Sequence, residues 1–229
     1  MIGAGRLGHA LSRALRGAGA TVSGPLVRDA VLPTCDVVLL CVPESSIAVA
    51  SAAIPVGPVV GHCSASYPMD ALAPHERFVA HPLLPITKEG ADFRGAVCAT
   101  DGSTPHAMQI AEQLAHTVGM RPVHVAADKR ALYHAAAAMA ANFITTLEDA
   151  AEQLAAPCGI TRAELAPLVR AALENWIALG GQRALVGPVS RGETETVARQ
   201  RAAVADTAPH LLPVWDALEQ STRMLAGRT

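Results

Sequence analysis

The chain opens with MIGAGRLG at residues 1–8, and this stretch decides the fold. Gly3, Gly5 and Gly8 have the spacing GxGxxG, and an amphipathic segment at residues 7–15 follows them. In a dinucleotide-binding turn, the first glycine allows a sharp bend after a strand and the second lets the backbone approach a pyrophosphate. The third lets the helix and the strand pack closely, with the helix N-terminus facing the phosphates. Glycine triplets also arise by chance in a glycine-rich chain, so the surrounding sequence decides what this one means.

That surrounding sequence holds a series of short apolar runs, at residues 21–23, 36–42, 58–63, 77–80 and 122–126. Helical patterns separate several of them, at residues 45–54 and 105–118, with Thr104 as the N-cap of the second. Strands without polar alternation, separated by helices, predict a parallel sheet covered on both faces. We therefore predict an α/β, Rossmann-like domain over residues 1–126.

Two features depart from the usual Rossmann pattern. Only Met1 and Ile2 precede Gly3, so either the true start lies upstream or this edge of the sheet is clipped. Residues 25–35 are too few for a helix and a strand, which predicts that one crossover unit is missing. No acidic residue ends the second predicted strand to bind a ribose hydroxyl. Arg28 lies there instead and could pair with a 2′-phosphate, which favours NADP over NAD; a solvated loop arginine is the alternative.

From residue 127 onward the pattern becomes helical. Residues 129–155 predict one helix of roughly seven turns, ending near Pro157 and Gly159. Thr161 and Glu164 have the spacing of a capping box that opens a helix at residues 162–179. Further helices are predicted at residues 194–204 and 211–225. An all-helical domain over residues 127–229, rich in Ala, Leu and Val, predicts a large apolar interface and hence a homodimer.

Charge and cysteine content narrow the class of protein. The formal net charge of −2 gives no reason to expect nucleic acid or an anionic membrane as partner. The five cysteines have no CxxC spacing, and Cys41 and Cys98 lie in apolar runs typical of buried strands. No signal peptide opens the chain, and its apolar runs are too short to span a membrane. We expect a cytoplasmic protein that acts on a small molecule.

Several phrases occur in a characteristic order: GAGRLG, DVVLLCVPESSI, GHCSAS, HPL, YHAAAAMAAN and ALVGPVSRGETETV. With them, essentially the whole chain resembles an uncharacterised Rossmann-like family with a domain of unknown function in its C-terminal half. That family is allied to ketopantoate reductases and 6-phosphogluconate dehydrogenases and is more distantly similar to pyrroline-5-carboxylate reductases. The resemblance implies an intertwined dimer, with NADP as cofactor (or NAD) and the substrate between the two domains.

The resemblance also implies site residues. His62 with Ser64, His81, and Tyr133 with His134 correspond to segments that converge on the family's cleft. Asn142 corresponds to a substrate-binding asparagine. The allied dehydrogenases often carry a lysine one turn before that asparagine, and Ala138 stands there in this chain. The residues expected at the cofactor are Gly3, Gly5, Arg6, Leu7, Gly8, Arg28, Val42, Pro43 and His62.

These side chains suit the reduction of a small 2-oxo acid such as ketopantoate. His134 can supply a proton, because the unperturbed pKa of imidazole lies near neutrality. His134, Ala138 and Asn142 lie on one face of a helix by their spacing, and Arg191 can clamp a carboxylate with two parallel hydrogen bonds. Ser64, His81, Tyr133 and Arg191 are therefore assigned to the substrate, and His134 and Asn142 to catalysis.

Other interpretations remain open for the same residues. His134 and Asn142 could simply connect helices, and Arg191 could form a salt bridge at a dimer interface. Reduction of a cyclic imine is the enzymatic alternative, and a non-catalytic nucleotide-binding dimer is the alternative from another class. The histidine spacings do not suit a zinc site, so no metal is expected. Ser64 lacks the GxSxG elbow of a hydrolase.

Overall fold

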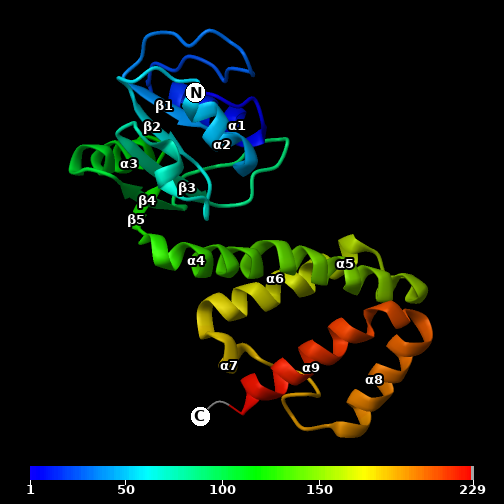
Figure 1. Ribbon diagram of the computed structural model, residues 1–229. Helices are drawn as coiled ribbons and strands as arrows, with labels where there is room; N and C mark the ends of the chain where they lie inside the picture. The colour runs from blue at the N-terminus through cyan, green and yellow to red at the C-terminus, as the bar shows by residue number, and fades with distance from the viewer. Residues whose placement is uncertain (228–229) are drawn as a thin grey trace. The chain divides into compact units, whose positions relative to one another are not determined.

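The computed structural model describes residues 1–227, in which a mixed sheet with flanking helices is followed by helices only (Figure 1). The elements of the sheet-containing part are α1 (Arg6–Gly17), β1 (Val37–Leu40), α2 (Glu44–Ala52), β2 (Val59–His62), β3 (Arg77–Leu83), β4 (Val97–Gly102), α3 (Pro105–Thr117), β5 (Arg121–His124) and α4 (Arg130–Ala137). Contacts along the chain define two compact units, Met1–Ala141 and Asn142–Thr229. The sequence-based domain bounds, 1–126 and 127–229, stay a prediction.

The sheet has the strand order β1-β2-β3-β4-β5, and the Rossmann-like class is confirmed. The prediction of an entirely parallel sheet is wrong at one place, because β4 runs antiparallel to β3, with His81 opposite Ala99. A parallel return needs a crossover, usually a helix. Residues 84–96 form neither helix nor strand, so the chain turns back directly beside β3.

The glycine turn lies where the first strand of a Rossmann fold would end. Ile2 makes isolated parallel bridges to Leu26 on one side and to Leu40 on the other, so this strand is reduced to a single pairing position. The strand predicted at residues 21–23 is wrong, because the pairing falls at Leu26 instead. Residues 27–36 contain neither helix nor strand, which confirms the missing crossover unit.

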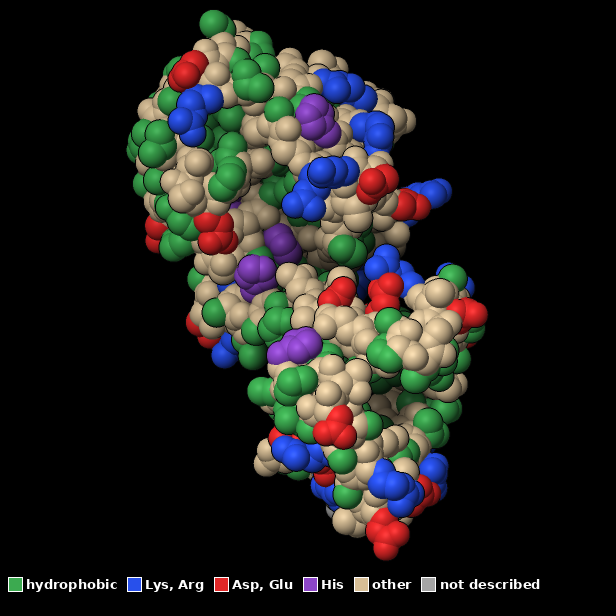
Figure 2. Space-filling view, turned by 90° about the vertical axis from the view of Figure 1, so that its right-hand side faces the viewer, with side chains coloured by type: hydrophobic (Ala, Val, Ile, Leu, Met, Phe, Trp, Pro, Cys, Tyr) green, Lys and Arg blue, Asp and Glu red, His purple; other side chains and the backbone are tan. Residues whose placement is uncertain are grey.

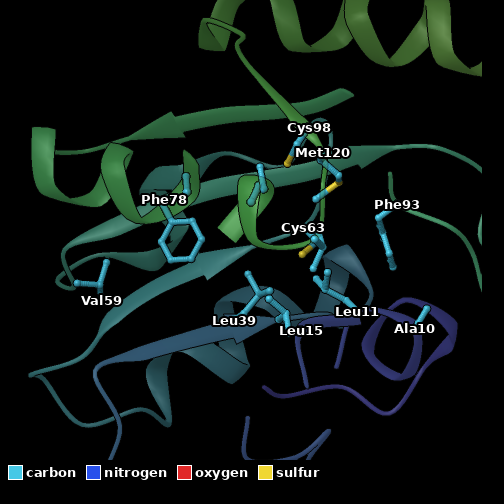
Figure 3. Close-up of a cluster of buried hydrophobic side chains, with 14 of the residues drawn as sticks. Ala10, Leu11, Leu15, Leu39, Val59, Cys63, Phe78, Phe93, Cys98 and Met120 are labelled. Carbon is cyan, nitrogen blue, oxygen red and sulfur yellow. The ribbon is translucent and has the colours of Figure 1, made fainter. Parts of the chain in front are cut away.

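Each face of the sheet has its own core, because alternate strand residues point to opposite faces. On one face, Leu39, Val59 and Phe78 pack with apolar residues of α1 and α3. Figure 3 shows Leu11 and Leu15 of α1 against this face, near Leu39. On the other face, a second cluster contains Val38, Leu40 and Val60 with Ile47 of α2 and Leu72. Val38, Leu40 and Val60 therefore point to the face of the sheet that α2 covers.

Local signals fix several helix ends as predicted. The Thr104 side chain accepts a hydrogen bond from the Ala107 amide at the start of α3. The capping box of Thr161 and Glu164 opens α6 (Arg162–Leu179). The single helix predicted at residues 129–155 is not regular, because Ala138–Phe143 form a π-helical segment between α4 and α5 (Ile144–Ala155). π-Helical turns are rare and are frequently found at functional sites.

The second unit continues with α7 (Gly181–Ala184), which the sequence did not predict, α8 (Thr194–Thr207) and α9 (Leu212–Ala226). No residue of α5, α6 or α9 is buried, within the part of the chain that the structure describes. Large apolar side chains stand exposed there instead, among them Leu168, Trp176 and Ile177. Figure 2 shows hydrophobic side chains spread over the surface. Among residues 1–227, no helix combines the length and the apolar character that crossing a membrane requires.

Candidate functional site

The three glycines of the opening turn have different surroundings. A Cβ on Gly3 would lie 2.3 Å from the Cys41 carbonyl oxygen, and one on Gly8 would lie 1.9 Å from the Gly3 carbonyl oxygen. Both positions therefore exclude any side chain on packing grounds. A Cβ on Gly5 would meet nothing within 4 Å. Internal packing thus requires glycine at positions 3 and 8, whereas the space in front of Gly5 is open to an external group.

Gly5 is also the N-cap of α1, and no side chain caps this helix end. The first turn of α1 contains no acidic residue. Unpaired amide groups and the helix dipole favour an anion at such an end. Arg6 is exposed beside it, while Leu7 packs against the core. The turn therefore fits a pyrophosphate in both space and charge.

A cavity of about 620 Å³ lies beside this turn. Its lining includes four residues predicted for the cofactor, Gly3, Arg28, Val42 and Pro43. The loop at residues 27–32 and the start of α2 form its walls. Arg28 is exposed there and, among residues 1–227, has no hydrogen bond or ion pair. The cavity therefore lies where the crossover unit is missing, and it contains a basic side chain that suits the adenosine end of a dinucleotide.

His62 ends β2, and its side chain is fully buried. Its Nδ1 accepts a hydrogen bond of 3.2 Å from the Ser64 amide, so the proton of the neutral ring is on Nε2. Nε2 is buried and has no partner among the described residues. Burial, with the Arg130 guanidinium as the next cause, lowers the pKa of His62 to about 4. A buried N–H group without a partner is costly, so its presence in the protein calls for an explanation.

Ser64 follows β2 and is held in a small network around Glu44. Its hydroxyl donates to Glu44 Oε1 and accepts from the amides of Ser66 and Tyr67. The Ser66 hydroxyl donates to the same carboxylate oxygen at 3.0 Å. These hydrogen bonds, that from Ser64 above all, lower the pKa of Glu44, whose carboxylate lies close enough to interact electrostatically with His134 and His62.

His81, Tyr133 and His134 lie together. His81 Nδ1 is 2.9 Å from the Tyr133 hydroxyl, and the His81 and His134 ring centroids are 6.1 Å apart. His62 and His81 lie on neighbouring strands, and by alternation both point to the face that carries α2. His81, His134 and Tyr133 thus form a polar group, with His62 on the same face of the sheet.

A buried ion pair between Arg130 and Asp101 holds α4, which carries Tyr133 and His134, against the sheet. Arg130, at the start of α4, pairs with Asp101 on β4, and its side chain is only 6% exposed. Asp101 also accepts from the Gly102 amide and lies 3.5 Å from His124 Nε2. The pair attaches the first turn of α4, and with it Tyr133, to the sheet. Because Arg130 is already paired, it offers no free cation for a substrate carboxylate.

Asn142 and Arg191 belong to the second unit. Asn142 is exposed in the π-helical segment, where its carbonyl oxygen accepts from the Thr146 hydroxyl. Arg191 is exposed and forms an ion pair of 2.5 Å with Glu193 in the loop before α8. Their assignment to the substrate stays a prediction.

The sequence missed Glu44 and Arg130 as members of the site. Glu44 was visible in the phrase VPESSI, directly after an apolar run, which is where ligands approach such sheets. Arg130 gave no comparable signal, because only the fold brings it to Asp101. Among residues 1–227, no three His, Cys, Asp or Glu side chains are placed to hold a metal ion.

These features define the chain as a Rossmann-like α/β protein with a helical second part. The family model that matches residues 96–222 is described as a domain of unknown function (DUF2520), and the chain belongs to this family. No curated protein matches the chain.

Three solved structures illustrate the likeness of fold. A protein from Bacteroides fragilis, described as a candidate NADP oxidoreductase, has a TM-score of 0.86 and 19% identity, covering 97% of this chain and 96% of its own. A protein from Thermotoga maritima has a TM-score of 0.78 and 21% identity, covering 88% and 83%. A reductive aminase from Aspergillus terreus, in complex with NADPH and ethyl-5-oxohexanoate, has a TM-score of 0.71 and 17% identity, covering 97% and 92%.

Proposed function

We propose that the protein is an NADP-dependent reductase of a small C=O compound, with a 2-oxo acid of the ketopantoate kind as first candidate. The observation that carries this proposal is the glycine turn. Gly3 and Gly8 are required by contacts within the protein, whereas Gly5 leaves open space at an uncapped helix N-terminus. An external anionic group at this helix end would account for glycine at position 5, the second glycine of the turn.

The cofactor would be held by the chain's own residues along this edge. The backbone of Gly3, Gly5 and Gly8 would face the pyrophosphate with Arg6 and Leu7 behind it, and Arg28 would face a 2′-phosphate. Val42, Pro43 and the free Nε2–H of His62 complete the set. When bound, the reduced nicotinamide supplies a hydride. The NADP complexes among proteins of similar fold support this assignment.

The substrate would be bound by Ser64, His81, Tyr133 and His134 of the first unit. The roles of Asn142 and Arg191 stay a prediction from the resemblance. Arg191 would hold a carboxylate once its pairing with Glu193 is exchanged. His62 and His81 are neutral, so Glu44 contributes the unbalanced charge beside them. This carboxylate favours the second candidate function, reduction of a cationic imine, which would be attracted to Glu44.

We also propose that the working form is a cytoplasmic homodimer made through the second unit. The helices α5, α6 and α9 have no buried residue among those described, and Ile177 is 75% exposed. Helices that leave large apolar side chains exposed need an apolar partner, and a second copy supplies the same face. The free cysteines suit a reducing compartment.

Titration of the purified protein with NADPH and NADH, followed by nicotinamide fluorescence, tests the proposal. We expect micromolar binding of NADPH that weakens at least tenfold in Gly5→Leu, whose side chain would occupy the anion's space. Gly17→Leu is the matched control, since Gly17 lies at the other end of α1 and also has open space. Arg28→Gln should weaken NADPH and leave NADH unchanged. No binding of either nucleotide at millimolar concentration would leave the non-catalytic dimer as the better interpretation.

A further inference from the structure

One hydrogen-bonded pair joins the sheet to α4 at the candidate site. His81 Nδ1 lies 2.9 Å from the Tyr133 hydroxyl oxygen, and the two rings meet edge to face with their centroids 5.6 Å apart. His81 projects from β3 and Tyr133 from α4, and the Arg130–Asp101 ion pair attaches the first turn of α4 to β4. Both members of the pair are therefore held by packed elements of the same unit.

Burial keeps both members uncharged near neutral pH. It lowers the pKa of His81 to about 4 and raises the pKa of Tyr133 to about 12. A neutral imidazole has one donor and one acceptor nitrogen, so the pair has two arrangements. In one, Tyr133 donates to Nδ1. In the other, the Nδ1–H group donates to the hydroxyl oxygen, and the Tyr133 hydrogen is free for a ligand.

We propose that Tyr133 gives the proton to the substrate and that His81 positions its hydroxyl group and replaces the proton. This inference rests on the proposed function and moves the donor role from His134 to Tyr133. His134 is exposed, and no hydrogen bond holds its ring within residues 1–227. A proton donor must be kept in hydrogen-bond geometry with the reacting atom, and the pair provides that restraint for Tyr133.

The proton transfer leaves no charge on the pair. As a hydride adds to the substrate carbon, the Tyr133 O–H bond breaks and its proton bonds to the oxygen of a ketone or the nitrogen of an uncharged imine, which takes the electron pair of the C=O or C=N bond. A cationic imine already carries this proton and needs none from the pair. The Nδ1 proton of His81 moves to the Tyr133 oxygen, and Nε2 takes a proton from solvent. The imidazole ends as its other neutral tautomer. The reaction therefore consumes one hydride and one solvent proton.

The titratable groups around the pair are His134 on α4, His62 on β2 and Cys98 on β4. Glu44 on α2 and Arg130 on α4 act on His62 rather than on the pair itself. His81 and Tyr133 both keep their neutral form between pH 5 and pH 9, so the turnover number should be level across that range.

The pair can be tested first without cofactor. The chain has two tyrosines, so Tyr67→Phe leaves Tyr133 as the sole source of tyrosinate absorbance. At pH 10, an ordinary tyrosine is about half ionised, whereas Tyr133 should be ionised by only about 1%, with full ionisation on addition of urea at higher pH. Half ionisation of the folded protein at pH 10 would show that the buried pair does not exist.

Turnover with ketopantoate and with 1-pyrroline-5-carboxylate then tests the role. Tyr133→Phe should lower kcat by about 10²–10⁴-fold, the range of general acid catalysis, with unchanged NADPH binding. His81→Asn should also lower kcat. The double variant should have the same kcat as Tyr133→Phe alone, because the two residues act as a unit. His116→Asn, an exposed histidine on α3, is the control.

Each failure has its own meaning. If the wild-type protein does not bind NADPH, the proposed function is wrong, whatever the tyrosine absorbance shows. If the wild type binds NADPH but reduces neither compound, the inference falls with the proposed function. If the wild type turns over and Tyr133→Phe does too, the inference alone is wrong. If His134→Ala abolishes turnover and Tyr133→Phe does not, the proton comes from His134.

Discussion

Gly8→Ala should destabilise the first unit although alanine is the better helix former. The new Cβ would lie 1.9 Å from the Gly3 carbonyl oxygen. A carbon and an oxygen approach no closer than about 3.3 Å, so α1 must retreat by roughly 1.4 Å. The obstructing atom is backbone and cannot rotate away, which places the cost near the upper end of the ~1–3 kcal/mol seen for overpacking. The helix propensity of alanine returns about 1 kcal/mol, leaving a net loss of about 2 kcal/mol.

Gly17→Ala is the internal comparison, since this glycine ends the same helix and a Cβ there meets nothing within 4 Å. In thermal unfolding followed by circular dichroism, each kcal/mol shifts Tm by about 2–4 °C for a chain of this size. Gly8→Ala should therefore melt about 4–8 °C below the wild type, and Gly17→Ala at or slightly above it. Equal melting temperatures for the two variants would mean that the close contact between α1 and the turn is not real.

Three further predictions concern the support of the site. Arg130→Met should lower the free energy of unfolding by about 3–5 kcal/mol in urea titrations, because it leaves Asp101 partly buried without its cation; Arg94→Met, from an exposed pair, should leave the urea midpoint nearly unchanged. Stability should fall as pH drops from 6.5 toward 4, because the unfolded chain protonates its imidazoles before the folded protein protonates His62 and His81. His62→Gln should shrink that fall by roughly 2–3 kcal/mol between pH 7.5 and 4.5; an unchanged fall would contradict a buried neutral ring. Thr104→Ala should cost about 1 kcal/mol as a lost N-cap, whereas Thr117→Ala at the other end of α3 should be nearly neutral.

The parts of the fold that depend on interactions between residues close in sequence were predicted correctly. The Thr104 cap and the capping box at Thr161 depend on contacts within one turn of helix, and the close approach of Gly8 to Gly3 in the GxGxxG turn spans five residues. The reversal of β4 could not be predicted in this way, because strand direction depends on whether the intervening loop forms a helix, and its composition does not decide that. The strand placed at residues 21–23 failed for a related reason, since pairing with Ile2 is a long-range contact.

The candidate site was predicted in part. The resemblance named His81, Tyr133 and His134, and the structure places these three together. It did not name Glu44 or Arg130, whose importance comes from hydrogen bonds to residues about 20 and 29 positions away. The π-helical turn at Ala138–Phe143 also gave no sequence signal, because Ala, Met and Phe all occur in ordinary α-helices.

The distribution of polar groups argues against a protein that uses this fold for assembly alone. The sheet positions of His62 and His81 point to the same face as Val60 and Val79, where apolar residues would pack without a desolvation cost. Two neutral imidazoles and an unpartnered N–H group lower the stability of the unit at acidic pH and add no compensating ion pair. Perturbed titratable groups concentrate where a ligand or a reaction uses them. A purely structural dimer would lose nothing by replacing them with Val or Leu, so their presence beside the glycine turn favours a site that handles protons.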